Sequence, residues 1–199
     1  TKIDPRSLGR VVVLMGGMSS EREVSLSSGA GVLKALKDRG VEAEAFDPAE
    51  KKLSELEAGH YDRAFIALHG RFGEDGTIQG VLEYLGLPYT GPGVQASAVA
   101  IDKSATRIVW QAAGLPVAEG LTVTSADEAG RVARELGSSV VVKPDNEGSS
   151  IGVTKLKDAT EADIRAALET ALKLNRRVLV EKRVFGREFT VAILNGKAQ

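Results

Sequence analysis

The stretch RVVVLMGGMSSEREVS, residues 10–25, predicts how the chain begins its fold. Residues 10–15 form a short apolar run rich in β-branched side chains, which is typical of a buried strand. Two glycines follow, and the polar residues after them predict the start of a helix. Ser20 and Glu23 have the spacing of a capping box, in which each side chain accepts a free backbone amide. Gly40 predicts the end of this helix.

The alternation of strand and helix continues through the first half of the chain. VEAEAF (41–46) and DRAFIALH (62–69) are typical of strands, and GTIQGVLEYLG (76–86) is typical of a helix. Such alternation predicts an α/β fold with a parallel sheet and crossover helices. Ligands bind such sheets at the carboxyl ends of the strands. GGMSSE (16–21) and HGRFGEDG (69–76) both fall at such ends, so both are candidate site segments.

A different pattern follows residue 100. Helices and strands still alternate, but the last two expected strands, residues 176–184 and 186–194, are close enough to form an antiparallel pair joined at Phe185–Gly186. Helices on a mostly antiparallel sheet predict a second, α+β domain, with the boundary at residues 95–103. The further elements expected here are helices at 102–114, 125–137 and 159–174, and strands at 118–124, 138–144 and 151–156.

Composition excludes several classes of function. The chain has 199 residues, a formal net charge of −1 and 43% hydrophobic residues, which is the balance of a globular protein. The charge argues against nucleic acid as the main partner, because binding its phosphates needs a basic face. The absence of cysteine excludes disulfides and thiolate metal sites and is compatible with a reducing cytoplasm. No apolar run reaches the ~20 residues of a membrane span, and we expect no membrane partner and a cytoplasmic location.

The two glycine-rich segments of the first domain each allow two interpretations. In GGMSSE, Glu21 either completes the helix cap or, held as an anion by the helix N-terminus, binds a ligand ammonium. In HGRFGEDG, His69 either orients a small acid, with Glu74 setting its tautomer and charge, or is a single histidine beside a solvated turn.

The second domain contains a comparable ambiguity in KPDNEGSSIG, residues 143–152. This loop either only joins two strands or also holds phosphate, with Lys143 kept extended by the proline that follows it. Lys103, at a helix start, gains nothing from the helix dipole and is either a ligand cation or a surface lysine. Glu181 and Glu188 by themselves are typical of exposed edge charges.

Taken together, these motifs resemble the D-alanine–D-alanine ligase family of the ATP-grasp superfamily. The pattern HGxxGEDGxxQGxLExxGxPYTG followed by Asp-Lys is far more specific than a single glycine loop. The matching segments occur in the family's order and cover most of the chain: residues 16–29, 67–103, 141–153 and 181–194.

The resemblance implies a fold and a reaction. The fold is a Rossmann-like, parallel-sheet substrate domain at residues 8–101, an α+β ATP-grasp subdomain at 102–190, and the start of a C-terminal subdomain at 191–199. In the implied reaction, ATP phosphorylates the carboxylate of one D-alanine and the amine of a second displaces the phosphate. The product, D-alanyl-D-alanine, serves peptidoglycan precursor synthesis.

The resemblance also implies roles for individual residues. Glu21 and Ser149 are the implied catalytic residues, with Glu21 on the ammonium of the first D-alanine. His69, partnered by Glu74, lies near the carboxylate of that substrate. The implied ATP-binding residues are Lys103, Lys143, Ser149, Ser150, Glu181, Lys182, Val184 and Glu188.

Other implications concern magnesium, oligomeric state and alternative functions. The family's magnesium ligands and its transition-state arginine lie beyond the matched residues, so we expect no metal ligand within residues 1–199. Arg183 stands where some relatives have an aromatic residue, which predicts different packing at the adenine edge. Many relatives are homodimers, and we expect the same here. The alternatives are a related ligase with a different second substrate, and a non-catalytic module that binds a nucleotide or an amino acid.

Overall fold

The computed structural model describes residues 4–199, which fold into two compact units. The first unit ends at Pro116 but also contains Pro144–Gly152. The second unit consists of Val117–Lys143 and Val153–Gln199. The loop that the sequence singles out, residues 143–152, is therefore divided between them, with Lys143 in the second unit and Ser149 in the first.

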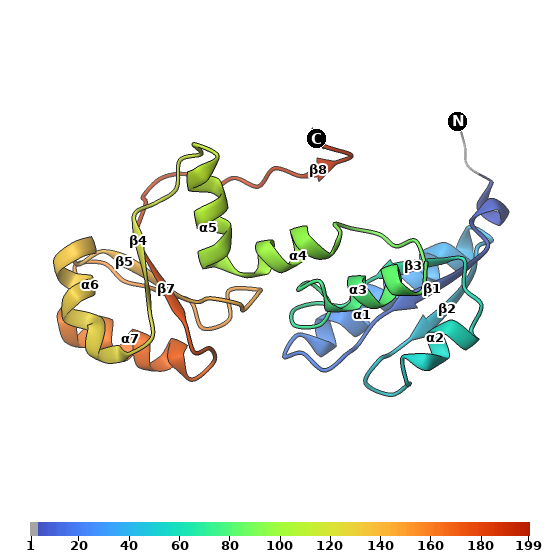
Figure 1. The fold of residues 1–199 in the computed structure, drawn as a ribbon, viewed down its shortest axis with the longest axis horizontal. Helices are drawn as coiled ribbons and strands as arrows, with labels where there is room; N and C mark the ends of the chain where they lie inside the picture. The colour runs from blue at the N-terminus through green and yellow to red at the C-terminus, as the bar shows by residue number, and fades with distance from the viewer. Residues whose placement is uncertain (1–3) are drawn as a thin grey trace. The chain divides into compact units, whose positions relative to one another are not determined.

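The first unit is built on a parallel three-stranded sheet with the order β2-β1-β3 (Figure 1). All but the first residue of the central strand are buried, as a parallel strand covered on both faces requires. Its elements are the 3₁₀ turn Pro5–Leu8, β1 Arg10–Leu14, α1 Arg22–Asp38, β2 Glu42–Phe46, α2 Ser54–Ala58, β3 Arg63–Ile66, α3 Thr77–Tyr84, α4 Val94–Ile101 and α5 Lys103–Ala112.

The core of the first unit joins the sheet to α2 and α3. Val12, Leu14 and Ala64 from the strands pack with Leu56 of α2 and Leu82 of α3. The packing leaves the carboxyl ends of β1 and β3 next to the loops that follow them. A short bridge from Ala64 to Tyr89 extends the sheet at the β3 edge.

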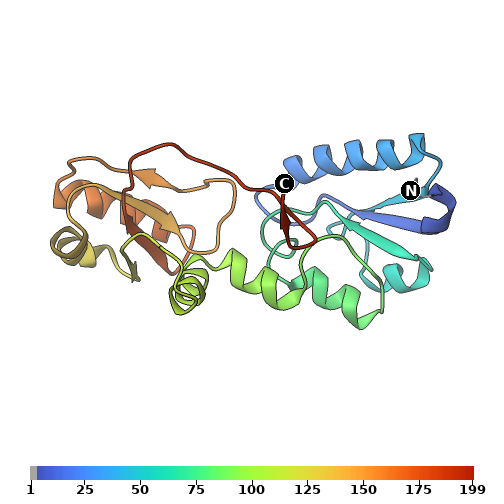
Figure 2. The same ribbon diagram turned by 90° about the horizontal axis from the view of Figure 1, so that it is seen from above.

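The second unit is built on a four-stranded sheet with the order β4-β7-β5-β6, in which β4 pairs with β7 and β5 with β6 antiparallel. The strands and helices of this unit are seen from another side in Figure 2. Alternate valines of β5 and β7 pack on α6 and α7, through residues such as Val132 and Leu168. Its elements are β4 Gly120–Val123, the 3₁₀ turn Ala126–Glu128, α6 Ala129–Leu136, β5 Val140–Pro144, β6 Thr154–Lys155, α7 Glu161–Leu172, β7 Val178–Lys182, β8 Ile193–Leu194 and β9 Lys197–Ala198.

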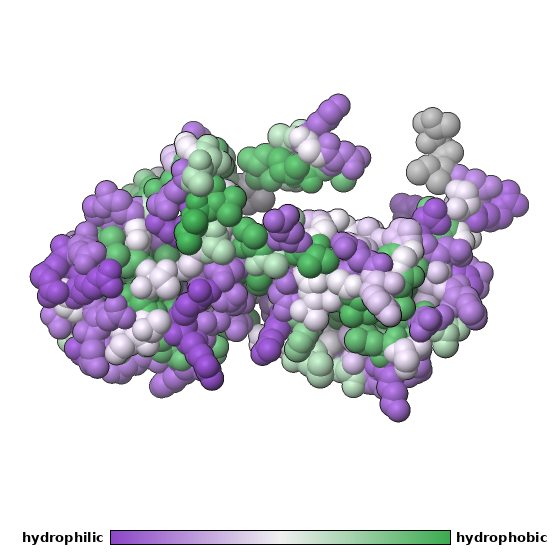
Figure 3. Space-filling view, in the orientation of Figure 1, coloured by the Kyte–Doolittle hydropathy of each residue, from purple (hydrophilic) through white to green (hydrophobic). Residues whose placement is uncertain are grey.

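The fold class predicted from the sequence is confirmed: a parallel α/β sheet is followed by helices on an antiparallel sheet. Helix α4 is an element that the sequence analysis missed. None of the helices among residues 4–199 is long and apolar enough to cross a membrane. The exposed apolar side chains include Ile108 and Trp110 on α5, where hydrophobic surface gathers in the space-filling view (Figure 3).

Two local predictions are wrong. Residues 186–194 do not pair with residues 176–184, because β7 already lies between β4 and β5 and has no free edge; Ile193–Leu194 pairs with Lys197–Ala198 instead. The capping box at the start of α1 does not form either. Glu21 occupies the N-cap position, and its side chain makes no capping hydrogen bond.

Candidate functional site

The carboxylate of Glu21 is the centre of the candidate site in the first unit. Although it is a charged residue at a helix N-terminus, Glu21 is only 5% exposed. Its backbone carbonyl accepts a hydrogen bond from the amide of Ser25, 3.0 Å away, which begins the helix. Its side chain turns inward, where the hydroxyl of Ser149 donates a hydrogen bond to Oε1. A buried carboxylate is costly without partners, so its placement calls for a ligand or a fixed donor.

Two glycines make room for this carboxylate. A Cβ at Gly70 would lie 2.7 Å from Oε2 of Glu21, and a Cβ at Gly148 would lie 3.1 Å from the same oxygen. Gly70 also has a φ of +64°, which favours glycine. The glycines of HGRFGEDG and EGSSIG therefore bring two loops, far apart in sequence, against one acidic side chain.

Ser19 connects the turn before Glu21 to the end of β3. Its hydroxyl donates to the carbonyl of His69 at 2.8 Å and accepts from the amide of Glu21 at 3.2 Å. The two candidate segments at the strand ends are thereby joined by a hydrogen-bonded side chain. The turn before α1 and the end of β3, both selected from the sequence as strand-end segments, are therefore in direct contact.

Asp47 and Arg22 fix the glycine turn, and the sequence analysis did not single out either. Asp47 accepts the amide of Gly17 at 3.0 Å and lies 2.7 Å from the Arg22 guanidinium, which itself donates to the carbonyl of Gly17 at 2.9 Å. Partial burial alone would raise the pKa of Asp47, but these donors and the Ala49 amide outweigh it and lower that pKa. The signal was available, since Asp47 directly follows the strand at 42–46 and so reaches the same sheet edge.

His69 and Glu74 are near each other but are not hydrogen bonded. His69 Nδ1 lies 3.9 Å from Glu74 Oε1, which is too long for a hydrogen bond. Glu74 Oε2 instead accepts the amide of Gly70 at 2.9 Å and closes the loop on itself. His69, Glu74 and the buried Gln79 border a cavity of about 480 Å³ between this loop and α4.

Lys103 holds the other end of the loop that carries Ser149. Its Nζ donates to the carbonyls of Glu147 at 2.5 Å and Asp145 at 3.4 Å. The fully buried Asp145 accepts the amide and the hydroxyl of Ser104 through Oδ1 at 2.9 and 2.8 Å. Ser149 and Ser150 have φ values of 47° and 60°, a left-handed conformation that costs free energy in residues with a Cβ. The helix start at Lys103 thus anchors the loop at its base.

The candidate residues of the second unit form ion pairs with each other and with neighbours. Lys143 bonds to the carboxylate of Glu181, and both side chains are largely buried. The Lys182 ammonium lies 2.6 Å from Glu119, and Glu188 lies 3.3 Å from Lys155. The remaining candidate, Val184, is 76% exposed.

The structure therefore groups the candidate residues into two sets. Within residues 4–199, no cluster of three or more His, Cys, Asp or Glu side chains is arranged to hold a metal ion. The set in the first unit combines a buried acid with hydroxyl donors and a histidine and suits a small ligand with an ammonium group: Glu21, Ser149, His69, Glu74, Lys103 and Ser150. The set in the second unit is a group of paired charges: Lys143, Glu181, Lys182 and Glu188, with Val184 exposed nearby in sequence.

Comparison with known proteins agrees with the motifs. The family model described as D-ala D-ala ligase N-terminus matches residues 40–92, and that described as D-ala D-ala ligase C-terminus matches residues 109–199. The D-alanine--D-alanine ligase of Acidovorax ebreus is 52% identical over 198 residues, and that of Paracidovorax citrulli is 53% identical over 194 residues. The matches cover 100% and 98% of this chain but only 59% and 58% of those relatives.

Solved structures give the same result. The structure of D-alanine--D-alanine ligase from Bacillus anthracis has a TM-score of 0.81 and 35% sequence identity, and covers 95% of this chain and 62% of that one. A second structure from the same organism, described as complexed with ATP, also has a TM-score of 0.81, with 32% identity, and covers 95% of this chain and 63% of that one. From its motifs, its fold and these matches, the chain belongs to the D-alanine–D-alanine ligase family.

Proposed function

We propose that this chain supplies the amino-acid-binding and nucleotide-binding elements of a ligase that joins two D-alanines at the expense of ATP. The observation that carries the proposal is the buried carboxylate of Glu21, held by Ser149 and by the loops of Gly70 and Gly148. The family match supports D-alanine as the substrate, and the buried acid supports binding of its ammonium by this chain.

The first D-alanine binds in the first unit under this proposal. Its ammonium pairs with Glu21, whose burial in a medium of low dielectric strengthens the attraction. Ser149 already donates a hydrogen bond to this carboxylate, so an ammonium bound to Glu21 would also contact the loop that carries Ser149. His69, at the end of β3, lies on the side of the substrate carboxylate and, with Glu74, sets the local charge there.

ATP binds through the cations and the paired acids. Lys143 and Lys103 bind phosphate oxygens, and the closing loop covers the phosphates with Ser149 and Ser150. Glu181 and Lys182, together with the backbone of Val184, meet the adenine edge, and Glu188 accepts the ribose hydroxyls. The ion pair between Lys143 and Glu181 holds the two side chains against each other before the nucleotide arrives.

The proposed chemistry activates a carboxylate. A carboxylate oxygen of the first D-alanine takes the terminal phosphoryl group, and ADP leaves. The amine of the second D-alanine, having lost a proton, then attacks the carbonyl carbon; the C–N bond forms, the C–O bond to phosphate breaks, and phosphate leaves. The cationic side chains stabilise negative charge on the phosphoryl oxygens.

We propose magnesium for the whole protein, but not for the site formed by the residues described. The residues described, 4–199, hold no cluster of acids and histidines suited to a divalent cation. We therefore assign no step to a metal and no ligand to it among these residues. We also propose, from the family alone, a homodimer in the cytoplasm.

Measurement of phosphate release tests the proposed reaction. The protein expressed from its complete gene should release phosphate from ATP and magnesium only when D-alanine is added. Mass spectrometry should then identify D-alanyl-D-alanine, whereas a mixed product would indicate a different second substrate. Absence of D-alanine-dependent phosphate release would contradict the proposal.

The binding-module alternative makes a different prediction for the 199-residue chain. Because this chain spans about three-fifths of its curated relatives, binding and catalysis need to be measured separately. Calorimetry on the chain alone should detect ATP and D-alanine binding if both sets of residues act as proposed. Binding by the chain, combined with no turnover by the protein from the complete gene, would favour the module over the ligase.

A further inference from the structure

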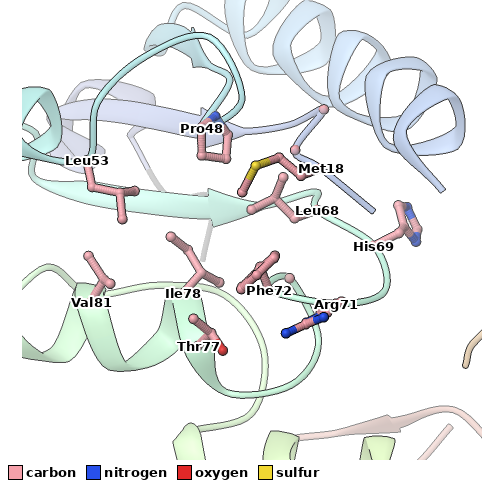
Figure 4. A pocket seen from close by; sticks show the side chains of 13 residues that line it. Met18, Pro48, Leu53, Leu68, His69, Arg71, Phe72, Thr77, Ile78 and Val81 are labelled. Atoms are coloured by element: carbon pink, nitrogen blue, oxygen red, sulfur yellow. The ribbon is translucent and has the colours of Figure 1, made fainter. Parts of the chain in front are cut away.

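A second cavity of the first unit lies beside the candidate site and is not used by the proposed reaction. It measures about 210 Å³ and lies between the carboxyl ends of β1 and β3 and the first turns of α3. Figure 4 shows Met18, Leu68 and Ile78 pointing into the space between the sheet and the helix. The lining residues that matter to its chemistry are Met18, Leu53, His69, Arg71, Phe72 and Val81.

The walls of this cavity are almost wholly apolar and partly open. Met18, Leu53 and Phe72 all border the cavity, and all three are exposed; Met18 is 69% exposed. Among residues 4–199, the polar side chains around it come only from His69, Arg71 and Thr77. Open apolar surface that rims a cavity is typical of a binding site.

Phe72 is held in place as a wall of the cavity. Its φ of +69° is unusual for an aromatic residue and costs free energy. Two hydrogen bonds hold it: its amide donates to Asp75 at 3.0 Å, and its carbonyl accepts the amide of Ile78 at 3.1 Å. Burial alone would raise the pKa of Asp75, but the Phe72 and Thr77 amides lower it, so the carboxylate that holds the loop stays charged.

Arg71 gives the cavity a positive rim. Its guanidinium carbon lies 5.0 Å from the centre of the Phe72 ring, and within residues 4–199 no ion pair joins Arg71 to an acid. A cation left without an acidic partner at the mouth of an apolar cavity complements an anion attached to a hydrocarbon. Ammonium ligands would be repelled there, and neutral ligands would gain nothing from it.

We propose that this cavity binds a small apolar carboxylate, with its hydrocarbon part between β3 and α3 and its carboxylate at Arg71. The volume suits one six-membered ring, since a dry cavity of about 150 Å³ lined by similar side chains binds benzene. The site is distinct from the Glu21 site in its chemistry, because it offers a cation and an apolar wall rather than a buried acid. The proposal does not depend on the ligase reaction.

Three probes of similar shape and different charge test the ligand class. Phenylacetate, benzylamine and benzyl alcohol are titrated into the chain and followed by ligand-observed and protein NMR. His69 borders both this cavity and the larger cavity beside Glu74, whereas His60 borders neither, so a His69 shift that Val81→Phe abolishes locates the binding here. Phenylacetate should shift the His69 signals and leave those of His60 unchanged, and it should bind at least about threefold more tightly than either other probe.

Two variants test the residues. Arg71→Gln should weaken phenylacetate binding by roughly two- to fivefold, as expected for an exposed charge pair. Arg187→Gln is the matched control, because Arg187 stacks on Phe189 at the same 5.0 Å but borders no part of this cavity. Val81→Phe, which fills the cavity from α3, should abolish the His69 shift while Arg71→Gln only reduces it.

Several results would overturn the proposal. Equal affinity for the three probes would remove the carboxylate preference, and so would an unchanged affinity in Arg71→Gln. Displacement of phenylacetate by D-alanine would show that the cavity belongs to the amino-acid site. No saturable shift of the His69 signals up to about 10 mM phenylacetate would exclude the site altogether.

Discussion

The N-terminus of α7 is closed by a capping box, whereas that of α1, for which the sequence predicts the same motif, is not. At α7, Thr160 Oγ1 accepts the amide of Asp163 at 3.2 Å and Asp163 accepts the amide of Thr160 at 2.8 Å. At α1, the N-cap residue is Glu21, and its carboxylate turns away from the helix into the interior. The two helix starts therefore use similar polar residues for different purposes.

The two helix starts differ in which residues hold them. The α7 motif lies on the surface and serves only its helix. The α1 turn is instead held by distant residues, with Asp47 on the Gly17 amide and Ser19 on the carbonyl of His69. External support for the turn releases the Glu21 carboxylate from a capping role, and we infer that this release is what makes it available to a ligand.

The largest expected effect follows loss of the Glu21 charge. Glu21→Gln keeps the size of the side chain but removes the anion that would pair with the substrate ammonium. Because hydrogen bonds to charged groups contribute about 1.5–3 kcal/mol, the KM for the first D-alanine should rise roughly tenfold to a hundredfold. Kinetics of D-alanine-dependent phosphate release in the protein from the complete gene measure this change, with the KM for ATP nearly unchanged.

Two other variants control for this result. Glu23→Gln changes an exposed acid in the same helical turn and should leave both KM values close to those of the parent. Lys143→Ala should have the opposite selectivity, with ATP binding weakened and D-alanine binding retained. If Glu21→Gln and Glu23→Gln behaved alike, the buried carboxylate would not be the ammonium site.

The next largest effect should come from the support of the α1 turn. Asp47→Ala removes the acceptor of the Gly17 amide and the partner of Arg22, so the turn should lose about 1–3 kcal/mol of local stability. Hydrogen exchange at the Gly17 amide measures this loss. Glu50→Ala is the matched control, since Glu50 pairs with the same arginine at 3.2 Å but is exposed, and it should cost less than about 1 kcal/mol.

A smaller effect is expected at the cap that does form. Thr160→Ala should lower the free energy of unfolding of the second unit by about 1 kcal/mol, the usual contribution of an N-cap side chain. Ser20→Ala, at the position where the sequence predicts a cap for α1, should change stability by only a few tenths of a kcal/mol. Denaturant unfolding of both variants measures the difference, and equal losses would mean that the α1 cap forms in solution.

The sequence predicts the fold class and most elements because periodicity and β-branched runs report burial directly. The sequence predicts less well which side chains and which strands pair with each other. The spacing of Ser20 and Glu23 satisfies the local rule for a cap, but the rule cannot register that Gly70 and Gly148 leave room for a neighbouring acid to turn inward. The predicted pairing of residues 186–194 with the strand before them is wrong for a similar reason, because the local pattern does not show that both edges of β7 are occupied.

The candidate site shows the same division. Glu21 and His69 could be selected from the sequence because they follow strands of a parallel sheet. The direct contact between Glu21 and Ser149 could not be predicted, because it joins residues 128 positions apart. The roles of all these residues remain predictions. Asp47 lay within reach of the strand-end argument and was missed because an acid before a proline is also typical of a turn.

The smallest expected effect is a shift in proton binding at the two helix starts. Hydrogen bonds from the side chain and the amide of Thr160 lower the pKa of Asp163, and those from Arg22, Gly17 and Ala49 lower that of Asp47 despite its partial burial. A carboxyl whose pKa is lower in the folded chain than its unfolded value of about 3.9 stabilises the fold above that pH, and this contribution is lost as the pH falls through the folded pKa. NMR titration from pH 6 to pH 2 should therefore show midpoints below about 3.9 at the Thr160 and Gly17 amides. A midpoint at or above that value for Gly17 alone would mean that Asp47 does not hold the α1 turn, and the contrast between the two helix starts would then need another cause.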